Sequence, residues 1–228
     1  CTSLQKLDLS GLTSLATIAD NFLNGCTTLT ELKLNNLTNV KTIGQAFLQN
    51  CTNLQTLNLN GLTGVTTIAN NFLDGLTNLT TLNMTGLTSV QTISSYFITG
   101  CTSLTNLDLS GWGSVQTVGE HFLKGCIGLT NVDLSGLSNI TSIPNYFLED
   151  CSSLSSLQLN DWKKVNAVCT NFLSGCTSLT TLELKNWIGM VNVPTNFLQG
   201  CTSVQNLDIS GWSNVATIND DFLSGCTN

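Results

Sequence analysis

The sequence predicts an α/β solenoid, a right-handed coil of short rows that stack along one axis. The 228 residues divide without a gap into nine rows of 25, which start at residues 1, 26, 51, 76, 101, 126, 151, 176 and 201. Like residues recur at like row positions, and a period of roughly 20–50 residues is typical of repeat architectures. A single row cannot bury its apolar side chains, whereas stacked rows can.

The amino-acid composition excludes some classes of protein and some classes of binding partner. The chain is 41% hydrophobic and 9% charged, which is enough apolar surface for a core. All seven cations are lysines and the net charge is -7, so we expect no nucleic-acid partner. No apolar run reaches the ~20 residues of a membrane span, and no signal peptide is visible. We expect a single domain over residues 1–228, as an uncapped fragment of a longer array, because neither end carries a polar capping row.

The first half of each row predicts a strand. Each row follows the pattern L-x-x-L-x-L-x-x-L, which the first row fills with Leu4, Leu7, Leu9 and Leu12. Leu7 and Leu9 are two residues apart, so both side chains point to one side of a strand and the residues between them point to the other. We expect these strands to pair as a parallel β-sheet on the concave face of the coil.

The second half of each row predicts a short turn on the convex face. A Leu15–Ile18 pair precedes Phe22 in the first row, and all nine phenylalanines of the chain occupy this one row position. Row positions 11 and 25 hold glycine, replaced only by Asn or Asp, so we expect a left-handed residue at both corners. Pro144 and Pro194 at row position 19 indicate an N–H that is not needed, as at the start of a helical or 3-10 turn.

These features carry a family resemblance. The leucine pattern, with Phe22-Leu23-Asn24-Gly25-Cys26 closing one row and opening the next, resembles the leucine-rich-repeat class and, within it, the BspA-like or Treponema pallidum-type subclass. The resemblance covers the whole chain, although the alanine usual before the phenylalanine is found only at Ala46. It implies a surface protein of a bacterium or protist, located at the cell surface or outside the cell, and in some members a role in adhesion.

The cysteines predict a buried column of free thiols. Nine of the ten stand at row position 1, and Leu76 takes that position in the fourth row. Leucine can replace a small buried hydrophobe but not a disulfide partner or a zinc ligand. In-register side chains run parallel, so their Cβ atoms do not converge to the ~3.8 Å that a disulfide needs. We therefore expect a cysteine ladder, no metal site and no disulfide.

The sequence lacks the combinations of residues that are typical of catalytic sites. His121 is the single histidine, and we interpret it as a surface or rim residue with no triad around it. We interpret the adjacent carboxylates Glu149–Asp150 and Asp220–Asp221 as solvent-exposed residues at the corners of their rows. No phosphate-binding or calcium-binding motif is present in the sequence. The sequence therefore predicts no enzyme and no cofactor.

Two sets of residues are candidates for contact with a partner. The first is the central outward column of the predicted concave sheet, where a short polar side chain or an acid predominates: Asp8, Lys33, Asn58, Asn83, Asp108, Asp133, Gln158, Glu183 and Asp208. The second is an aromatic strip at a row corner, for which ordinary packing is the simpler interpretation: Trp112, Trp162, Trp187 and Trp212.

Three functions remain open at this point. The first is a protein-binding or adhesion scaffold with an unidentified protein ligand. The second is a structural module whose uncapped rows stack end to end into a fibre or longer array. The third, a minor alternative, is ice binding through threonine ladders, which other residues interrupt. One ladder holds Thr2, Thr27, Thr52, Thr77, Thr102, Thr177 and Thr202, and the other holds Thr17, Thr42, Thr67, Thr92 and Thr117.

Overall fold

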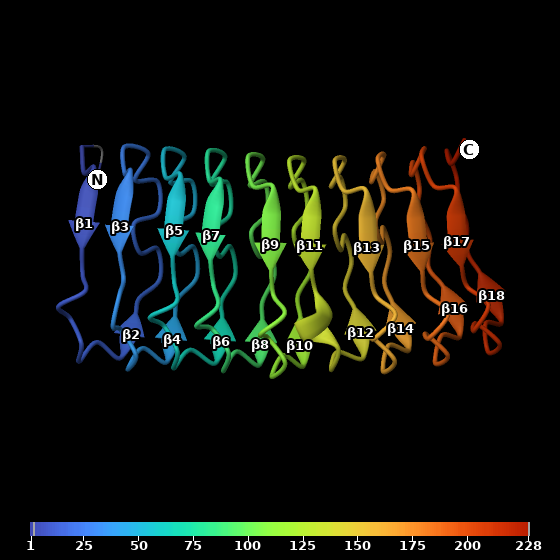
Figure 1. The fold of residues 1–228 in the computed structure, drawn as a ribbon, viewed down its shortest axis with the longest axis horizontal. Helices are drawn as coiled ribbons and strands as arrows, with labels where there is room; N and C mark the ends of the chain where they lie inside the picture. The colour runs from blue at the N-terminus through green and yellow to red at the C-terminus, as the bar shows by residue number, and fades with distance from the viewer. Residues whose placement is uncertain (2, 228) are drawn as a thin grey trace.

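The chain forms a single coil of stacked rows. A computed structural model describes residues 1 and 3–227. Each row contributes one three-residue strand and one two-residue strand, and Figure 1 shows the two kinds as parallel series along the length of the molecule. We call the outer surface of the three-residue strands the long-strand face, and row positions 12–19, which include the two-residue strands, the short-strand segment.

The long strands occupy row positions 6–8, where the pattern of leucines predicts them. The buried side chain is the central one, as at Leu32 and Leu57, and its two neighbours point outward. The strands are β1 (Lys6–Asp8), β3 (Glu31–Lys33), β5 (Thr56–Asn58), β7 (Thr81–Asn83), β9 (Asn106–Asp108), β11 (Asn131–Asp133), β13 (Ser156–Gln158), β15 (Thr181–Glu183) and β17 (Asn206–Asp208).

The short strands occupy row positions 17 and 18. The first residue is exposed or half-buried, and the second is a valine or isoleucine that is buried in most rows. The strands are β2 (Thr17–Ile18), β4 (Thr42–Ile43), β6 (Thr67–Ile68), β8 (Thr92–Ile93), β10 (Thr117–Val118), β12 (Ser142–Ile143), β14 (Ala167–Val168), β16 (Asn192–Val193) and β18 (Thr217–Ile218).

Pairing is parallel and joins residues 25 apart. Leu7 lies beside Leu32, and Thr17 lies beside Thr42, so each row position becomes a column along the coil. The long strands pair as β1–β3, β5–β7, β9–β11 and β13–β15–β17. The short strands pair as β2–β4–β6–β8–β10, β12–β14 and β16–β18.

The prediction of helical turns is wrong. Among the described residues the only helix is the 3-10 turn η1 (Ser135–Leu137), which lies at a different row position, so the α/β description gives way to an almost helix-free β-solenoid. In the predicted turn segment the N–H groups at row positions 21, 23 and 25 bond to neighbouring rows instead. Asn21 donates to the carbonyl of Gln45 at 2.8 Å, and Leu48 donates to the carbonyl of Phe22 at 3.0 Å. A helix would require those same donors within the row.

The prediction of two left-handed corners is half right. All nine residues at row position 25 have positive φ, including Asn50 at 59° and Asp150 at 60°. At row position 11 only Asn36 does. Glycine is needed there for close approach instead, because a Cβ on Gly86 or Gly136 would collide with a carbonyl oxygen of the preceding row.

The interpretation of the two prolines is also wrong. Where row position 19 is not proline, its N–H continues the short-strand ladder, as Gly119 does by donating to Ile93 at 2.8 Å. Pro144 and Pro194 follow β12 and β16 directly and have no N–H to donate. The short-strand sheet is interrupted between β10 and β12 and between β14 and β16, at the rows that carry these prolines.

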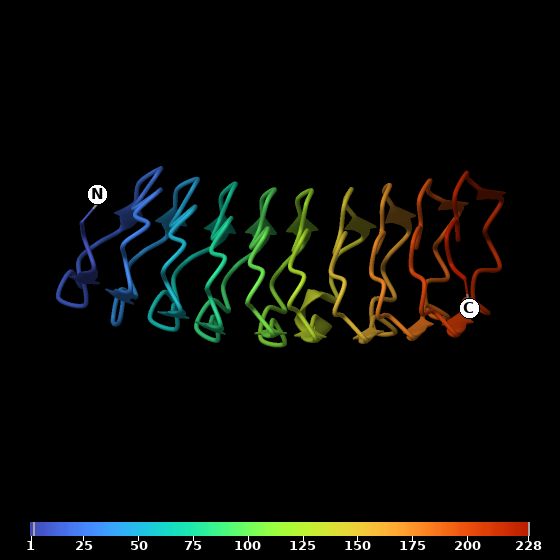
Figure 2. The ribbon, with the colours of Figure 1, turned by 90° about the horizontal axis from the view of Figure 1, so that it is seen from above.

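The core fills the inside of the coil. Phe47 through Phe197 are fully buried in the seven inner rows, and neighbouring rings of the whole phenylalanine column lie 4.8–6.0 Å apart between centroids. Figure 2 shows the rows along a nearly straight axis, so the surfaces are not strongly concave or convex. Extended chain on both sides gives both sides the same spacing of about 4.8 Å between rows, which explains the small curvature.

Candidate functional site

The central column of the long-strand face has a local structural role. In six rows an Asp or Asn at row position 8 accepts the backbone N–H of the residue two positions later, and Asp108 accepts that of Ser110 at 2.8 Å. This short-range bond of an Asx side chain fixes the end of the strand. The six are Asp8, Asn58, Asn83, Asp108, Asp133 and Asp208, whereas the longer or basic side chains of Lys33, Gln158 and Glu183 stay outside the motif.

These hydrogen bonds also lower the pKa of carboxylates in the central column. The hydroxyl and then the N–H of Ser10 lower the pKa of Asp8, and Ser110 and Ser210 do the same for Asp108 and Asp208. Hydrogen bonds to a carboxylate favour its charged form. The predominance of acids in this column is therefore explained in part by the way the strands end.

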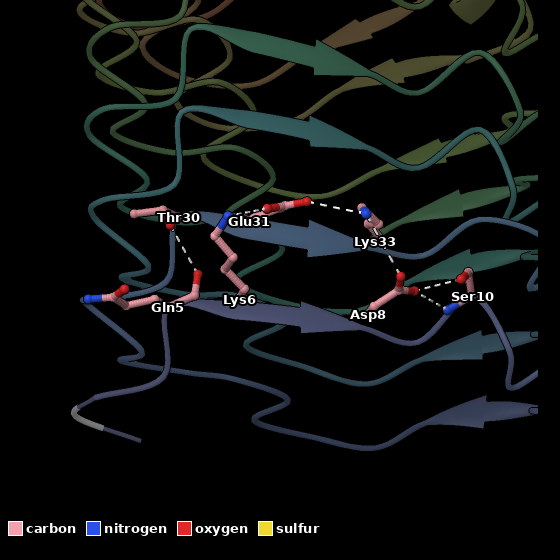
Figure 3. A network of polar contacts seen from close by, with 7 residues as sticks. All are labelled: Gln5, Lys6, Asp8, Ser10, Thr30, Glu31 and Lys33. Carbon is pink, nitrogen blue, oxygen red and sulfur yellow. Dashed lines mark hydrogen bonds and ion pairs between the residues drawn. The ribbon is translucent and has the colours of Figure 1, made fainter.

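The first two rows carry a network of alternating charge, shown in Figure 3. Glu31 on β3 lies 3.1 Å from the ammonium of Lys6 and 3.4 Å from that of Lys33, which in turn lies 3.9 Å from Asp8. Hydrogen bonding to Lys6 and then to Lys33 lowers the pKa of Glu31. All four side chains are at least two-fifths exposed, so a partner could exchange its own charges for these pairs at little cost.

The proposed aromatic strip lies in the core. Trp112, Trp162 and Trp187 are at most 1% exposed and Trp212 is 9% exposed, so the interpretation of a contact surface is wrong and ordinary packing is confirmed. Each indole packs against the phenylalanine of the preceding row, as Trp187 does against Phe172 at 5.6 Å. The indole N–H of Trp162, Trp187 and Trp212 donates to a core carbonyl, whereas Nε1 of Trp112 has no partner among the described residues.

The cysteines form the expected ladder, with a bond that the sequence does not reveal. All ten are free, and Cys51, Cys101, Cys126, Cys151, Cys176 and Cys201 are buried. Each of these thiols donates to the carbonyl 28 residues earlier in the chain, at row position 23, for example Cys126 to Ile98 at 2.9 Å. Burial raises the pKa of Cys51 to about 11 and those of Cys126 and Cys201 to about 12. Such thiols are poor nucleophiles, because the thiolate is the reactive form.

His121 is at the rim, as expected, but belongs to an aromatic stack. Its ring lies between those of Tyr96 and Tyr146, at 4.4 Å from each centroid. Burial, and then the charge of Lys124, lower the pKa of His121. The ammonium of Lys124 also lies 4.8 Å from the Tyr146 ring centroid. The signal in the sequence is the run of three rings at row position 21 of three consecutive rows.

The threonine ladders do not run the length of the coil. Thr17, Thr42, Thr67, Thr92 and Thr117 lie side by side on β2–β10, and the column then continues through Ser142, Ala167 and Asn192. In the other ladder Thr102 and Thr177 donate to carbonyls of the preceding row, and Thr2 lies outside the described residues. Ice binding therefore stays an untested alternative, which a measurement of thermal hysteresis would check.

Metal-binding clusters and membrane-spanning helices are absent from the described part of the chain. No group of three or more His, Cys, Asp or Glu side chains there is arranged to hold a metal ion. No helix in residues 1 and 3–227 is long and apolar enough to cross a membrane.

Comparison with protein families gives one consistent result. The model of the BspA-type leucine-rich repeat region matches residues 1–128, 66–188 and 116–228, which together span the whole chain. A comparison with curated protein sequences gives no significant match.

Solved structures match this chain at low sequence identity. A leucine-rich cell surface protein from Faecalibacterium prausnitzii A2-165 matches with a TM-score of 0.51 and 16% identity, over 93% of this chain and 75% of that one. The leucine-rich repeat protein of T. pallidum has a TM-score of 0.45 and 14% identity, over 93% and 71%. A leucine-rich repeat protein from Bacteroides ovatus ATCC 8483 has a TM-score of 0.35 and 17% identity, over 92% and 68%.

Proposed function

Because this chain belongs to the BspA-type leucine-rich repeat family, we propose that it is a non-enzymatic scaffold that binds a protein ligand in adhesion at a cell surface. The description of the similar F. prausnitzii protein as a cell surface protein supports the location. The contact surface in this proposal is the long-strand face, with Lys33, Gln158 and Glu183 as the members of the central column that are free of the strand-ending motif.

The observation that carries the proposal is the register of the long-strand face. Parallel pairing of residues 25 apart holds every outward side chain at a fixed place, so a partner meets a surface that needs little ordering on binding. The sequence varies along that surface: it begins with the charge network of Lys6, Glu31, Lys33 and Asp8 and ends with the acids Glu183 and Asp208. A fixed backbone with variable outward residues is suited to recognition.

Surface plasmon resonance against purified extracellular-matrix proteins tests this proposal. We expect at least one saturable interaction, which is lost in the variant Gln158→Arg on the long-strand face. The control is Asn166→Arg, which places the same side chain at an exposed position of the short-strand segment. If no matrix protein binds, or if the control variant loses binding equally, the long-strand face is not the contact surface.

A second candidate, end-to-end stacking of copies of this 228-residue chain, is favoured by its first and ninth rows. Leu12 is 50% exposed and Ile218 is 56% exposed, whereas the equivalent residues of the inner rows are mostly buried. We expect light scattering to show an average mass that rises with concentration, and Leu12→Lys to prevent the rise. A constant monomer mass up to millimolar concentration would rule out this candidate.

A further inference from the structure

Charge is divided unevenly between the segments of the row. The short-strand segment of the nine rows contains no acidic residue, although the chain has fourteen, and it contains three of the seven lysines: Lys41, Lys163 and Lys164. Among the described residues none of these three lysines forms an ion pair, whereas the other four do. A protein with a net charge of -7 therefore carries one surface that favours an anion.

An open hollow of about 670 Å³ lies on this acid-free surface, within rows 4–7. Its volume falls in the range of about 300–1,000 Å³ that small-molecule sites occupy. The hollow adjoins the interruption between β10 and β12, because Thr117 on β10 and Thr141, just before β12, both line it. Gly113 also lines the hollow at a row position where rows 1–4 have threonine, and a Cβ there would meet no other atom within 4 Å.

The lining offers unused hydrogen-bonding groups and one cation. Among the described residues the side-chain amides of Gln91 and Gln116 and the hydroxyls of Thr117 and Thr141 have no partner. The ammonium of Lys164 donates to Oδ1 of Asn139 at 2.7 Å, which leaves its other two protons available. Amides and hydroxyls both donate and accept, as the hydroxyls of a sugar do.

We propose that this hollow binds a carboxylate-bearing saccharide, with the carboxylate at Lys164 and the ring hydroxyls at the amides and hydroxyls of Gln91, Gln116, Thr117 and Thr141. A protein ligand fits less well, because no aromatic or aliphatic side chain lines the hollow to anchor it. A polyphosphate would need several cations, and only one lines the hollow. This site is separate from the long-strand face and stands without the adhesion proposal.

Isothermal titration calorimetry with trigalacturonic acid tests the site, with its methyl ester as the uncharged matched ligand. We expect the acid to bind and the ester to bind at least about tenfold more weakly, since a charged hydrogen bond contributes about that factor. Lys164→Ala should reduce the affinity for the acid by a similar factor. Lys163→Ala removes the same charge from the neighbouring residue, which does not line the hollow, and should leave the affinity within about twofold.

A second pair of variants tests the place of binding. Gly113→Thr narrows the hollow with the residue that rows 1–4 have at this position, and should lower the affinity for the acid by at least about tenfold while leaving the circular dichroism spectrum unchanged. Gly11→Thr is the control, because a Cβ there also meets no other atom and the site lies far along the coil. No binding of the acid at millimolar concentration would overturn the proposal, as would equal binding of the ester, equal losses for both lysines or an unchanged affinity in Gly113→Thr.

Discussion

Single residues in this coil are chosen mostly by backbone geometry and by hydrogen bonds between rows. Row position 25 could be predicted because glycine, Asn and Asp exchange there, and these residues tolerate positive φ. At row position 21, six of the nine left-handed residues are Asn, Asp or His, which is a similar signal, whereas the left-handed residues at row position 23 could not be predicted. In rows 1–8, Leu23, Leu48 and their equivalents have φ between 53° and 60°, and leucine gives no sign of that conformation. Burial of the leucine column offsets a conformational cost of roughly 1–2 kcal/mol per residue.

The carboxylates that end the strands should make stability depend on pH, and Asp108 offers a test of this. The pKa of Asp108 is lowered in the folded protein, so its contribution to stability is present above the unfolded pKa of about 3.9 and is lost as the pH falls through the folded value. Asp108→Asn keeps an acceptor oxygen but does not titrate. Thermal unfolding should give the native chain a higher Tm than the variant at pH 7, with the difference closing as the pH falls below about 4. A gap independent of pH would contradict this role of the carboxylate.

The tryptophans provide a matched pair of substitutions. Trp112 and Trp187 are equally buried, but only Trp187 donates its indole N–H, to Leu159 at 3.1 Å. Trp187→Phe should therefore lower the free energy of unfolding by about 1–2 kcal/mol more than Trp112→Phe does. Urea denaturation of both variants measures the difference. Equal losses would mean that the hydrogen bond contributes nothing net.

At the scale of elements, the strands could be predicted and the turns could not. The alternation around Leu7 and Leu9 indicates a strand because burial on one side requires a period of two. The segment of row positions 20–25 lacks such a sign, since its fold depends on N–H groups that bond alternately to the row before and the row after, as Leu48 and Asn21 do. Partners 25 residues away leave no trace in the local sequence.

Replacing Pro144 should add one backbone hydrogen bond between β10 and β12. In Pro144→Ala the new N–H should donate to the carbonyl of Val118, as Gly119 donates to Ile93, and join β12 to β10. Hydrogen exchange measured by NMR should then find the amide of residue 144 protected to the same degree as that of Gly119. Exchange as fast as in an exposed loop would show that a geometric feature other than the missing N–H interrupts the sheet.

At the scale of the whole molecule, the 25-residue repeat was sufficient to predict the stacked-row fold. Rows of 25 without a gap require columns of like residues, and the phenylalanine, leucine and cysteine columns are all present. Two features of the candidate site were not accessible in this way. The hollow depends on Gly113 and on the interrupted ladder at Pro144, and the burial of the four tryptophans depends on the depth of a row corner. Both depend on contacts between rows.

Because each row contacts only its neighbours, the same substitution should have different effects along the coil. Phe122→Ala empties a fully buried site between two rings and should cost about 3–5 kcal/mol. Phe222→Ala lies in the last row beside a single ring and should cost at most about half of that. Urea denaturation compares them, and similar losses would contradict a nearest-neighbour description.

The stacking of each row on its neighbours alone has a mechanical consequence. In the isolated 228-residue chain, a pulling force on the two ends should act first on the terminal rows, so the coil should unwind from its ends inward. Each released row would add about 80 Å of extended chain, the reach of 25 residues less the spacing of one row. Rows of equal length would lengthen the chain by equal increments under force, and the rows that remain folded would keep their strands in register.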